Sequence, residues 1–557
     1  MTGVRIEAEA LCRRTPSGRA VLQDVCLTIQ PGELVVIAGG SGAGKTTLLE
    51  ALAGLAALDR GQVHFDGIDA HREAPRFRTM LGYVPQDDIV HEELPLERTL
   101  RFSAALRLPG ASPAEVDDAV ARSMAELNLT DHAATRVAAL SGGQRKRASL
   151  AVELLTGPRV FFLDEPTSGL DPATGADLLA LLRRLADEGS TVVLTSHAVQ
   201  DLAAADRLVF LAPGGRLAFS GTASQALDYF GVDRLEQIYQ RIATERSPEV
   251  WGTRWAAERA ATTPGRPQPP ASTPPAVRPP AGPLRQWQVL TRRTAATLLH
   301  NRLTMAILLG SPAMVVAMFA VLFKPAAFDA TDPSPTAVIM IVFWIAFGVF
   351  FFGLTYGLLQ ICTEFAILRR ERLVGLRLGP YILAKTAVLL PFLVLVDVLM
   401  LAVLRVLDRL PEAGLATYGS LTVTLALNAA AALALGLLAS AVVPSPSQAT
   451  LILPMLCFPA VLFSGAIVPV PVMAWAGRAM SVLMPDRWAF EAIGVDLGVR
   501  TLFAEGGSPL GPPLLAAYGD TGSREVSTYW LILTVFAVVF TVATWVVLAR
   551  RTRTLTR

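Results

Sequence analysis

The chain has 557 residues, of which 52% are hydrophobic and 17% charged. It is too long for a single hydrophobic core and poor in charge for a wholly soluble protein, so we expect several domains, some of them in lipid. The 49 Lys and Arg residues nearly cancel the 47 Asp and Glu residues, and the net charge of +2 argues against a nucleic-acid partner.

The cysteine positions and the N-terminal segment exclude further classes of protein. The four cysteines, Cys12, Cys26, Cys362 and Cys457, lie far apart, which excludes a zinc protein and a disulfide-stapled secreted module. Residues 1–30 contain no apolar run long enough for a signal peptide. We therefore expect the N-terminus to stay in the cytosol.

Residues 1–232 have the pattern of an α/β domain. Short apolar runs at 33–38, 160–163 and 191–195 are each followed by a glycine-rich turn or a helical pattern. Apolar runs of this length that alternate with helices are typical of buried parallel strands.

The first of these runs leads into a phosphate-loop motif. Residues 39–46, GGSGAGKT, fit G-x-x-x-x-G-K-[ST] and lie between a strand-like and a helix-like segment. Glycines let backbone N–H groups surround phosphates, Lys45 would reach the terminal phosphates, and the Thr46 hydroxyl would ligate Mg²⁺. The alternative is a purely structural loop. The predicted nucleotide-binding residues are Gly39, Gly40, Ser41, Gly42, Ala43, Gly44, Lys45, Thr46 and Thr47.

A second apolar run, at 160–163, is predicted to be a buried strand, and Asp164 and Glu165 follow at its carboxyl end. In P-loop proteins the first acid at this place holds Mg²⁺. An adjacent second acid is free to polarise a water against the γ-phosphate. The alternative for this pair is an ordinary exit from a strand into a turn.

Two further elements complete the pattern. Residues 140–147, LSGGQRKR, offer a hydroxyl and bare backbone at a helix N-terminus, which is a second anion site. One γ-phosphate is not easily reached by both loops of a single chain, so this site should serve a neighbour's nucleotide. His197 follows the strand at 191–195, where its ring could sense the terminal phosphate; the alternative is a surface histidine.

This set of motifs resembles the nucleotide-binding domain of ABC transporters. The resemblance implies ATP and Mg²⁺ as cofactors and two such domains that face head to tail. The catalytic positions it implies are Glu165, the switch histidine His197, and Gln86 of the Q-loop. The Mg²⁺ ligands it implies are Thr46, Gln86 and Asp164. The signature and D-loop residues it implies are Ser141, Gly142, Gly143, Gln144 and Asp171.

One departure from that family concerns the adenine base. Many of these transporters stack adenine on an aromatic residue upstream of the phosphate loop, yet residues 1–30 contain no Phe, Tyr or Trp. Arg13 or Arg14 could stack on the base instead.

Residues 233–284 are predicted to form a proline-rich cytosolic linker. Nine prolines lie between Pro264 and Pro283, a composition that favours extended backbone and buries no core. The alternative role is a ligand for a proline-recognition domain.

The remainder, 285–557, is predicted to be an all-α transmembrane domain of six helices. Uncharged runs of 21, 31, 65 and 24 residues supply one, one, two and one spans, and a sixth candidate contains Asp397. Residues 285–301 suit a helix at the cytosolic interface, or else a soluble helix packed on the first domain. The predicted spans are 303–323, 336–361, 386–404, 416–440, 448–470 and 527–549.

Charge bias predicts the orientation. Arginine-rich flanks precede the first span, separate the second from the third, and follow the last. Segment 478–525 instead holds four arginines against six carboxylates. We therefore expect a multi-pass protein of the plasma (inner) membrane with the ATPase domain and both termini in the cytosol.

An ATPase domain that precedes six spans resembles the ABCG-like, reverse-ordered half-transporters, of bacterial type. Segment 364–372 is similar to their coupling helix, with Arg370, Glu371 and Arg372 as candidate contacts, and 483–491 to their re-entrant segment. The resemblance implies a cargo cavity on the dimer axis. Its candidate residues are Trp344, Phe347, Phe351, Asp397 and Phe458. For the aromatic residues the alternative is packing against lipid or helices, and for Asp397 it is a structural or shallow position.

The functional hypothesis is an ATP-driven dimeric exporter of an apolar or amphipathic substrate, such as a lipid, a drug or a lipid-linked molecule. A homodimer is expected, and a heterodimer is the alternative. The rival function is an ABC machine that moves nothing across the bilayer and transmits ATP-driven motion to envelope partners. No feature indicates an importer.

Overall fold

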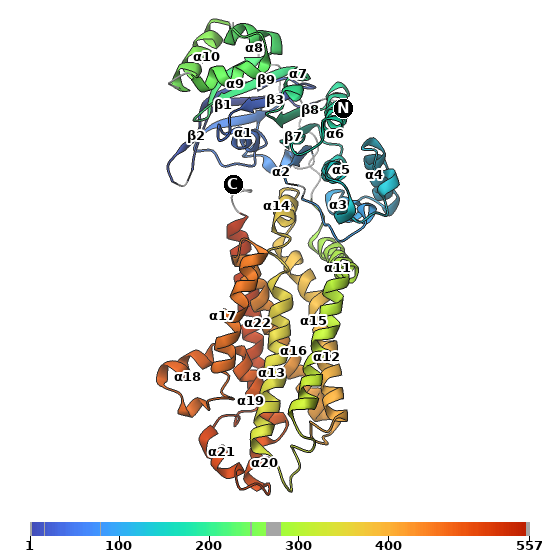
Figure 1. Cartoon of the computed structure of the whole chain (residues 1–557), viewed down its shortest axis with the longest axis vertical. Helices are drawn as coiled ribbons and strands as arrows, with labels where there is room; N and C mark the ends of the chain where they lie inside the picture. Colours follow the sequence, from blue (N-terminus) through green and yellow to red (C-terminus); the bar gives the residue numbers. More distant parts are fainter. Residues whose placement is uncertain are drawn as a thin grey trace. The chain divides into compact units, whose positions relative to one another are not determined.

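The computed structural model describes residues 3–15, 17–77, 80–87, 89–244, 248–262 and 280–552 (Figure 1). The chain forms two compact units. Unit 1 comprises Met1–Arg285, Ile367–Leu376 and Thr552–Arg557, and unit 2 comprises Gln286–Ala366 and Arg377–Arg551. Residues 263–279 of the predicted linker and 553–557 of the last predicted cytosolic flank lie outside the described residues.

Unit 1 is built on two sheets. A six-stranded sheet has the order β10-β9-β3-β8-β7-β6; five of its strands are parallel, and β10 is antiparallel at the edge. Its strands are β3 (Leu34–Gly39), β6 (Leu81–Val84), β7 (Val160–Asp164), β8 (Thr191–Thr195), β9 (Arg207–Ala212) and β10 (Arg216–Gly221). A four-stranded antiparallel sheet has the order β2-β1-β4-β5. Its strands are β1 (Ile6–Arg14), β2 (Ala20–Ile29), β4 (Arg60–Phe65) and β5 (Ile68–Asp69).

The parallel sheet is buried on both faces, which explains its uninterrupted apolar strands. Successive residues of β3 point into different cores: Val36 belongs to one hydrophobic cluster, and Val35 and Ile37 belong to the other. Helix α1 (Lys45–Leu52) contributes Leu48 and Leu49 to the second cluster, together with β1, β2 and β4. Helix α1 therefore packs between the two sheets, where it is held on both sides.

Helices surround these sheets. The first cluster contains residues of the helices that cover the other face of the parallel sheet. These helices are α3 (Leu96–Arg107), α4 (Pro113–Glu126), α5 (Gly142–Leu154), α6 (Pro172–Asp187), α8 (Ala223–Phe230), α9 (Leu235–Thr244) and α10 (Pro248–Thr262). The short elements α2 (Ala74–Phe77), η1 (Thr130–His132), η2 (Val137–Ala139) and α7 (Val199–Ala203) complete the unit.

Helices α9 and α10 fall inside the segment predicted as a linker, so the folded region continues past residue 232. Ile238 and Ile242 of α9 are buried, and so is Trp251 of α10. The Trp251 ring packs on Phe230 with centroids 5.1 Å apart. Burial of these side chains stabilises α9 and α10 on the sheet. The prolines that motivated the linker prediction begin only after α10 ends.

Unit 2 is helical, as predicted. Its long helices are α11 (Pro283–His300), α12 (Arg302–Leu322), α13 (Pro335–Leu358), α15 (Leu378–Val406), α16 (Leu415–Val442), α17 (Pro446–Leu462) and α22 (Val526–Arg551). Each of these helices except α11 overlaps a predicted span, but α17 ends at Leu462, before the end of the predicted span 448–470. In the described part of the chain, four helices are long and apolar enough to cross a membrane: α13, α15, α16 and α22. The described apolar part of α12, Pro312–Leu322, and helix α17 are shorter, so the count of six spans stays a prediction.

Short helices fill the segment between α17 and α22. They are η3 (Val470–Val472), α18 (Trp475–Val482), α19 (Pro485–Asp496), α20 (Val499–Glu505) and α21 (Gly511–Tyr518). The predicted re-entrant segment 483–491 falls mostly on α19. Figure 1 shows these helices gathered at one end of the unit 2 bundle.

Helix α16 packs along α13 through small residues. A Cβ atom placed on Gly353 would lie 2.8 Å from the Ala429 carbonyl oxygen, and one placed on Gly436 would lie 2.4 Å from the Leu354 carbonyl oxygen. Next to this contact, Asn428 Nδ2 donates to the Ala346 carbonyl oxygen at 2.9 Å. Small residues that let backbones approach are the usual basis of helix association in lipid.

We predict that Gly436→Leu destabilises the bundle, because the new side chain would separate α13 from α16. Overpacking of this kind costs about 1–3 kcal/mol or more. The thermal unfolding midpoint of the purified protein in lipid nanodiscs measures the effect. Gly419→Leu on the same helix is the matched control, because open space surrounds Gly419. Equal midpoints for the two variants would contradict the close-packed seam.

Candidate nucleotide site and associated contacts

The phosphate loop connects β3 to α1, and its glycines are required by geometry. Gly42 and Gly44 have φ angles of +74° and +97°, which L side chains rarely adopt. A Cβ atom on Gly44 would also lie 2.7 Å from the Val21 carbonyl oxygen. The loop therefore presents bare backbone at the N-terminus of α1, where an anion is stabilised by free N–H groups and the helix dipole.

Lys45, the first residue of α1, bends back over this loop. Its Nζ donates to the carbonyl oxygens of Gly39 at 3.2 Å and Gly40 at 3.4 Å. The same nitrogen lies 4.0 Å from Glu165 Oε1. The ammonium group thus stands between the loop and the acidic end of β7, and it is held by weak contacts that a phosphate group could replace.

Asp164 ends β7 and is buried, and two hydroxyl groups donate to the same oxygen of its carboxyl group. Thr195 Oγ1 donates to Asp164 Oδ1 at 2.6 Å, and Thr46 Oγ1 donates to it at 3.1 Å. Thr195 is the last residue of β8, the strand next to β7. The carboxylate is therefore fixed by residues from three adjacent elements: β7, β8 and α1.

Glu165 follows in a conformation that is uncommon for this residue type. Its φ angle is +45°, and its backbone N–H donates to Thr195 Oγ1 at 2.8 Å. Its Oε1 lies 3.6 Å from His197 Nδ1. A non-glycine residue held in the left-handed region is often found at a functional site. The turn aims the Glu165 carboxylate between Lys45 and His197.

These oxygen atoms suit Mg²⁺, which prefers hard oxygen ligands and often keeps several waters and phosphate oxygens. The Thr46 hydroxyl and the Asp164 carboxylate lie side by side at the phosphate loop. Within the described ranges no group of three His, Cys, Asp or Glu residues is placed to hold a metal ion by itself. The arrangement thus fits a metal that arrives with a nucleotide. Gln86 is exposed, and its described bond is a backbone one, from Lys146 Nζ to the Gln86 carbonyl oxygen.

The predicted signature residues lie elsewhere in unit 1, at the start of α5. Ser141 caps this helix: Gln144 N donates to Ser141 Oγ at 3.3 Å, and Ser141 N donates to Gln144 Oε1 at 2.9 Å. This reciprocal capping box orders the N-terminal turn, while Ser141 and Gly142 stay exposed. An ordered turn with exposed backbone N–H groups can receive an anion from outside the unit.

Asp171 lies beside this turn. It caps α6 by accepting from Thr174 N at 3.1 Å, and the hydrogen bonds from Thr174 lower the pKa of the Asp171 carboxyl. A Cβ atom on Gly143 would lie 2.5 Å from Thr174 Cγ2, so α5 and α6 meet closely at this point. The predicted residues therefore gather in two places, one around Lys45 and Asp164 and one around Ser141 and Asp171.

The predicted coupling residue Arg370 is buried within unit 1. Helix α14 (Phe365–Leu373) begins in unit 2, but its residues from Ile367 onward belong to unit 1. Arg370 Nε donates to Glu153 Oε1 at 2.7 Å, and its Nη1 and Nη2 donate to the carbonyl oxygens of Ile89 at 2.7 Å and Ser149 at 2.9 Å. Arg372 Nη1 donates to the Leu376 carbonyl oxygen at 2.7 Å, a local bond. Glu371 is buried.

Glu153 of α5 is shared by two arginines. Arg107 of α3 forms a bidentate pair with it, with both N–O distances at 2.8 Å. Burial alone would raise the pKa of Glu153, but the charges of Arg107 and Arg370 outweigh burial and lower it. A lowered pKa means that the stabilisation is present above the ordinary glutamate pKa and is lost only as pH falls through the lowered value. The Arg107–Glu153–Arg370 cluster therefore stays charged near neutral pH.

The residues predicted for a cargo cavity are on three helices of unit 2. Trp344, Phe347 and Phe351 form a series of ring contacts on α13, with centroids 5.9 and 6.1 Å apart. Phe458 on α17 is 68% exposed. Asp397 on α15 is buried, and its Oδ2 has no hydrogen-bond partner among the described residues. The structure describes no ring contact or hydrogen bond that joins Asp397 or Phe458 to the α13 aromatics in the described part of unit 2.

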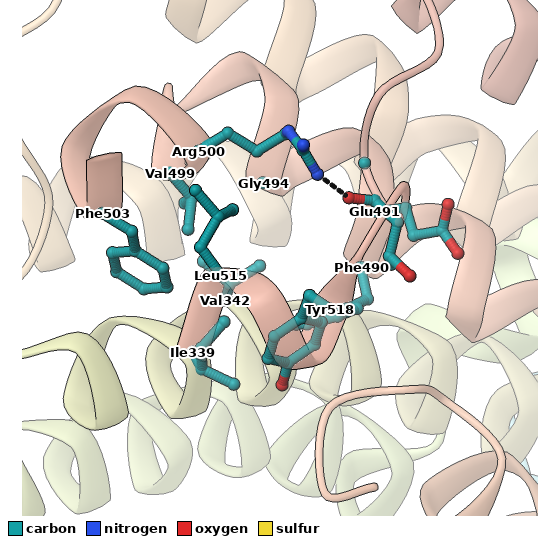
Figure 2. A pocket seen from close by; sticks show the side chains of 12 residues that line it. Ile339, Val342, Phe490, Glu491, Gly494, Val499, Arg500, Phe503, Leu515 and Tyr518 are labelled. Atoms are coloured by element: carbon teal, nitrogen blue, oxygen red, sulfur yellow. Dashed lines mark hydrogen bonds between the residues drawn. The ribbon is translucent and has the colours of Figure 1, made fainter. Parts of the chain in front are cut away.

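A cavity of about 50 Å³ lies instead among α13, α19, α20 and α21, as Figure 2 shows. Ile339, Phe490 and Tyr518 contribute to its lining. Arg500 borders it and closes the adjoining turn, because its Nη1 donates to the carbonyl oxygens of Gly519 at 2.6 Å and Thr521 at 2.9 Å. This volume has room for about one or two waters or a few methylene groups, and not for an amphipathic molecule.

Three residues of these sites were not predicted: Thr195, Arg107 and Glu153. Thr195 carried a signal, since a polar residue at the end of a buried strand next to the Asp164 strand is placed to bond with it. Arg107 and Glu153 carried none, because their partners are far away in the sequence.

The fold and the site together define the class of protein to which this chain belongs. A parallel sheet with a phosphate loop after one strand and paired acids after another forms a P-loop nucleotide-binding domain, and here it precedes an apolar helical domain. Comparison with known families agrees: residues 22–168 match the family described as "ABC transporter", and residues 285–495 match the family described as "ABC-2 type transporter". The chain belongs to the ABC transporter superfamily and has the reverse domain order, as predicted.

Individual relatives support the same branch. The chain is 34% identical over 488 residues to the ABC transporter ATP-binding/permease protein Rv1747 of Mycobacterium tuberculosis, a match that covers 85% of this chain and 55% of the relative. It is 39% identical over 238 residues to the broad substrate specificity ATP-binding cassette transporter ABCG2 of Bos taurus (40% of this chain, 34% of the relative). It is 28% identical over 531 residues to ABC transporter G family member 7 of Arabidopsis thaliana (86% and 71%). The chain thus spans about half of the first relative and about a third of the second.

We predict that Thr195→Val destabilises unit 1, because it leaves the partly buried Glu165 N–H without an acceptor and removes a donor from the buried Asp164. Loss of such a partner costs about 1–3 kcal/mol. The thermal unfolding midpoint without nucleotide measures the effect. Thr195→Ser keeps the hydroxyl and should stay closer to wild type than Thr195→Val, which keeps the γ-methyl group and loses only the hydroxyl; a Thr195→Val variant as stable as wild type would contradict the role assigned to the hydroxyl.

Proposed function

We propose that the protein is an ATP-hydrolysing half-transporter that works as a dimer and exports an apolar or amphipathic substrate across a membrane. The observation that carries this proposal is the convergence of Lys45, Thr46, Asp164, Glu165 and His197 at the carboxyl edge of one sheet. The membrane family match, the apolar helices and the ABCG-type relatives support transport.

The hydrolytic step follows from the positions of these side chains. The Glu165 carboxylate accepts a proton from the attacking water, Lys45 neutralises charge on the terminal phosphate, and His197 donates to that phosphate. Thr46 and Asp164, joined by Gln86, would hold Mg²⁺, which when bound neutralises phosphate oxygens. The held orientation of Glu165 limits its freedom to turn away from the water.

Dimer formation follows from the division of the site into two places. The signature turn with Ser141 and Gln144 and the neighbouring Asp171 offer a second set of anion contacts. In a head-to-tail pair, each chain's signature turn closes on the other chain's ATP. We expect a homodimer, since the chain carries every catalytic position.

Transmission to the membrane helices is assigned to α14. Arg370 ties this helix to α5, the helix that begins at the signature turn. Movement of α5 on ATP closure would therefore pull on α14, which continues covalently toward α13. Arg370 makes described side-chain bonds to α5, at Glu153 and Ser149, while the described bond of Arg372 is local.

The membrane setting is part of the proposal. The arginine-rich flanks support the part of the proposal in which the ATPase unit and both termini lie in the cytosol of a plasma (inner) membrane protein. The aromatic residues Trp344, Phe347 and Phe351, with Phe458 of a second copy, would offer a surface for flat or lipid-like cargo. Reconstitution into vesicles, with ATP hydrolysis measured against a panel of lipids and drugs and followed by flux of each hit, tests export. ATPase activity that depends on a protein partner and never on cargo would favour the non-exporting machine.

We predict that Glu165→Gln retains ATP binding and lowers hydrolysis by about 10²–10⁴-fold, because the amide does not accept the proton of water. The variant should also accumulate as an ATP-bound closed dimer. Nucleotide affinity, turnover and cross-linking of the two ATPase units measure the three effects. Normal turnover would contradict the assigned base. Lys45→Ala is the contrast: it should weaken ATP binding itself.

We predict that Arg370→Gln keeps basal ATP hydrolysis but uncouples it from stimulation by cargo. Glu153 keeps its bidentate partner Arg107, so unit 1 should stay folded and basal ATPase should stay within about twofold of wild type. Stimulation by cargo should be lost. Arg372→Gln is the matched control and should keep stimulation. Cargo stimulation that persists in Arg370→Gln would overturn this assignment.

A further inference from the structure

The signature residue Gln144 has an amide group whose orientation is fixed by the backbone. Ser141 N is a donor and lies 2.9 Å from Gln144 Oε1, so the oxygen of the amide must face Ser141. The amide nitrogen then points to the other side, where it lies 2.9 Å from His132 Nε2. His132 ends the short helix η1, which precedes the signature turn in the sequence.

This geometry selects one form of the histidine. The amide nitrogen of Gln144 can only donate, so His132 Nε2 must accept. An imidazole nitrogen accepts only when it carries no proton, so His132 is neutral, with its proton on Nδ1. The chain of bonds runs from the Ser141 N–H through Gln144 to His132.

Protonation of His132 would break this chain. Two donors would then face each other, His132 Nε2–H and the Gln144 amide. Either the side chains separate, or the amide turns over and places its NH₂ group against the Ser141 N–H. In both cases the turn that presents Ser141 and Gly142 loses a hydrogen bond.

The charged groups around His132 do not offset this change. In the part of the chain that the structure describes, no carboxylate lies within ion-pair distance of His132. Helix η1 itself carries Asp131, and α4, which packs against η1, ends at Glu126. On α5, Arg145 lies 3.7 Å from Glu92 and donates to the Leu140 carbonyl oxygen at 3.3 Å.

We infer that His132 is a positioning residue of the signature motif, and that it makes closure of this motif on the partner chain's ATP dependent on pH. The inference rests on the proposed function of the signature turn. It deepens that function by adding a regulatory input: the turn is ordered while His132 is neutral and loosens as His132 gains a proton.

The pH profile of ATP hydrolysis tests this inference. Full-length protein in nanodiscs is assayed from pH 8.0 to about 5.5, and wild type is compared with His132→Gln. Glutamine offers a neutral acceptor to Gln144 at every pH. We expect activity to be similar at pH 8 and the variant to retain about fivefold more of its activity at the acid end, the equivalent of one hydrogen bond. Because ATP and all other titratable groups of the chain are the same in the two proteins, their contributions cancel in the ratio.

His71→Gln is the matched control, because His71 is also hydrogen-bonded, through Nε2 to the Ala56 carbonyl oxygen at 3.1 Å, but it has no described bond to the signature turn. Its profile should follow wild type. Superimposable profiles for wild type and His132→Gln would overturn the inference. Absence of ATP hydrolysis in wild type at every pH would contradict the proposed function instead.

A second measurement does not depend on activity. Nitrogen NMR of histidine-labelled protein at pH 8, with the His132 signal assigned by its loss in His132→Gln, reports which ring nitrogen carries the proton. We expect a protonated Nδ1 and a bare Nε2. The opposite tautomer would overturn the inference even if the variant folds poorly.

Discussion

A parallel sheet that is buried on both faces has little room for polar side chains inside it, so polar groups collect where its strands end. In this protein the constraint acts on β3, β7 and β8, which are adjacent and point the same way. Their carboxyl ends bring the phosphate loop, Asp164 and Thr195 together. The hydroxyl of Thr195 then joins both acids of β7, because it bonds to the side chain of one and the backbone of the next. The remaining features of the nucleotide site are arranged around this junction.

The nucleotide site was largely predictable because its signals are local. Strand runs, glycine spacing and the Asp164–Glu165 pair can all be read within a few residues, and the sheet topology then forces them together. The order of α/β and helical domains was predictable for the same reason, since composition changes sharply along the chain. The linker boundary was placed too early because it was set from the proline-rich stretch, although α9 is amphipathic and buries Ile238 and Ile242. Helix α10 has little apolar contrast in its sequence, and the burial of Trp251 reveals that it is folded.

The contacts of the Arg107–Glu153–Arg370 cluster could not be predicted from the sequence. Arg370 stands out because it lies in an arginine-rich loop, but Glu153 is 217 residues away from it, in helix α5. No local pattern distinguishes a glutamate that will be buried between two arginines from one that will face water. The cost of burying three charges is met only by their mutual geometry, which requires the folded structure. The His132–Gln144 contact was likewise not predictable from a local sequence pattern.

The glycine contact between α13 and α16 has a consequence for motion. Helices whose backbones touch, and that are also joined by a side-chain bond from Asn428 to a main-chain carbonyl, resist sliding and twisting against each other. Helices α13 and α16 should therefore move as one rigid pair within unit 2. Helix α17 differs, because Pro454 and Pro459 lie inside it and each removes a backbone hydrogen-bond donor. Bending of unit 2 during ATP turnover would then concentrate at α17, while α13 and α16 would keep their positions relative to each other.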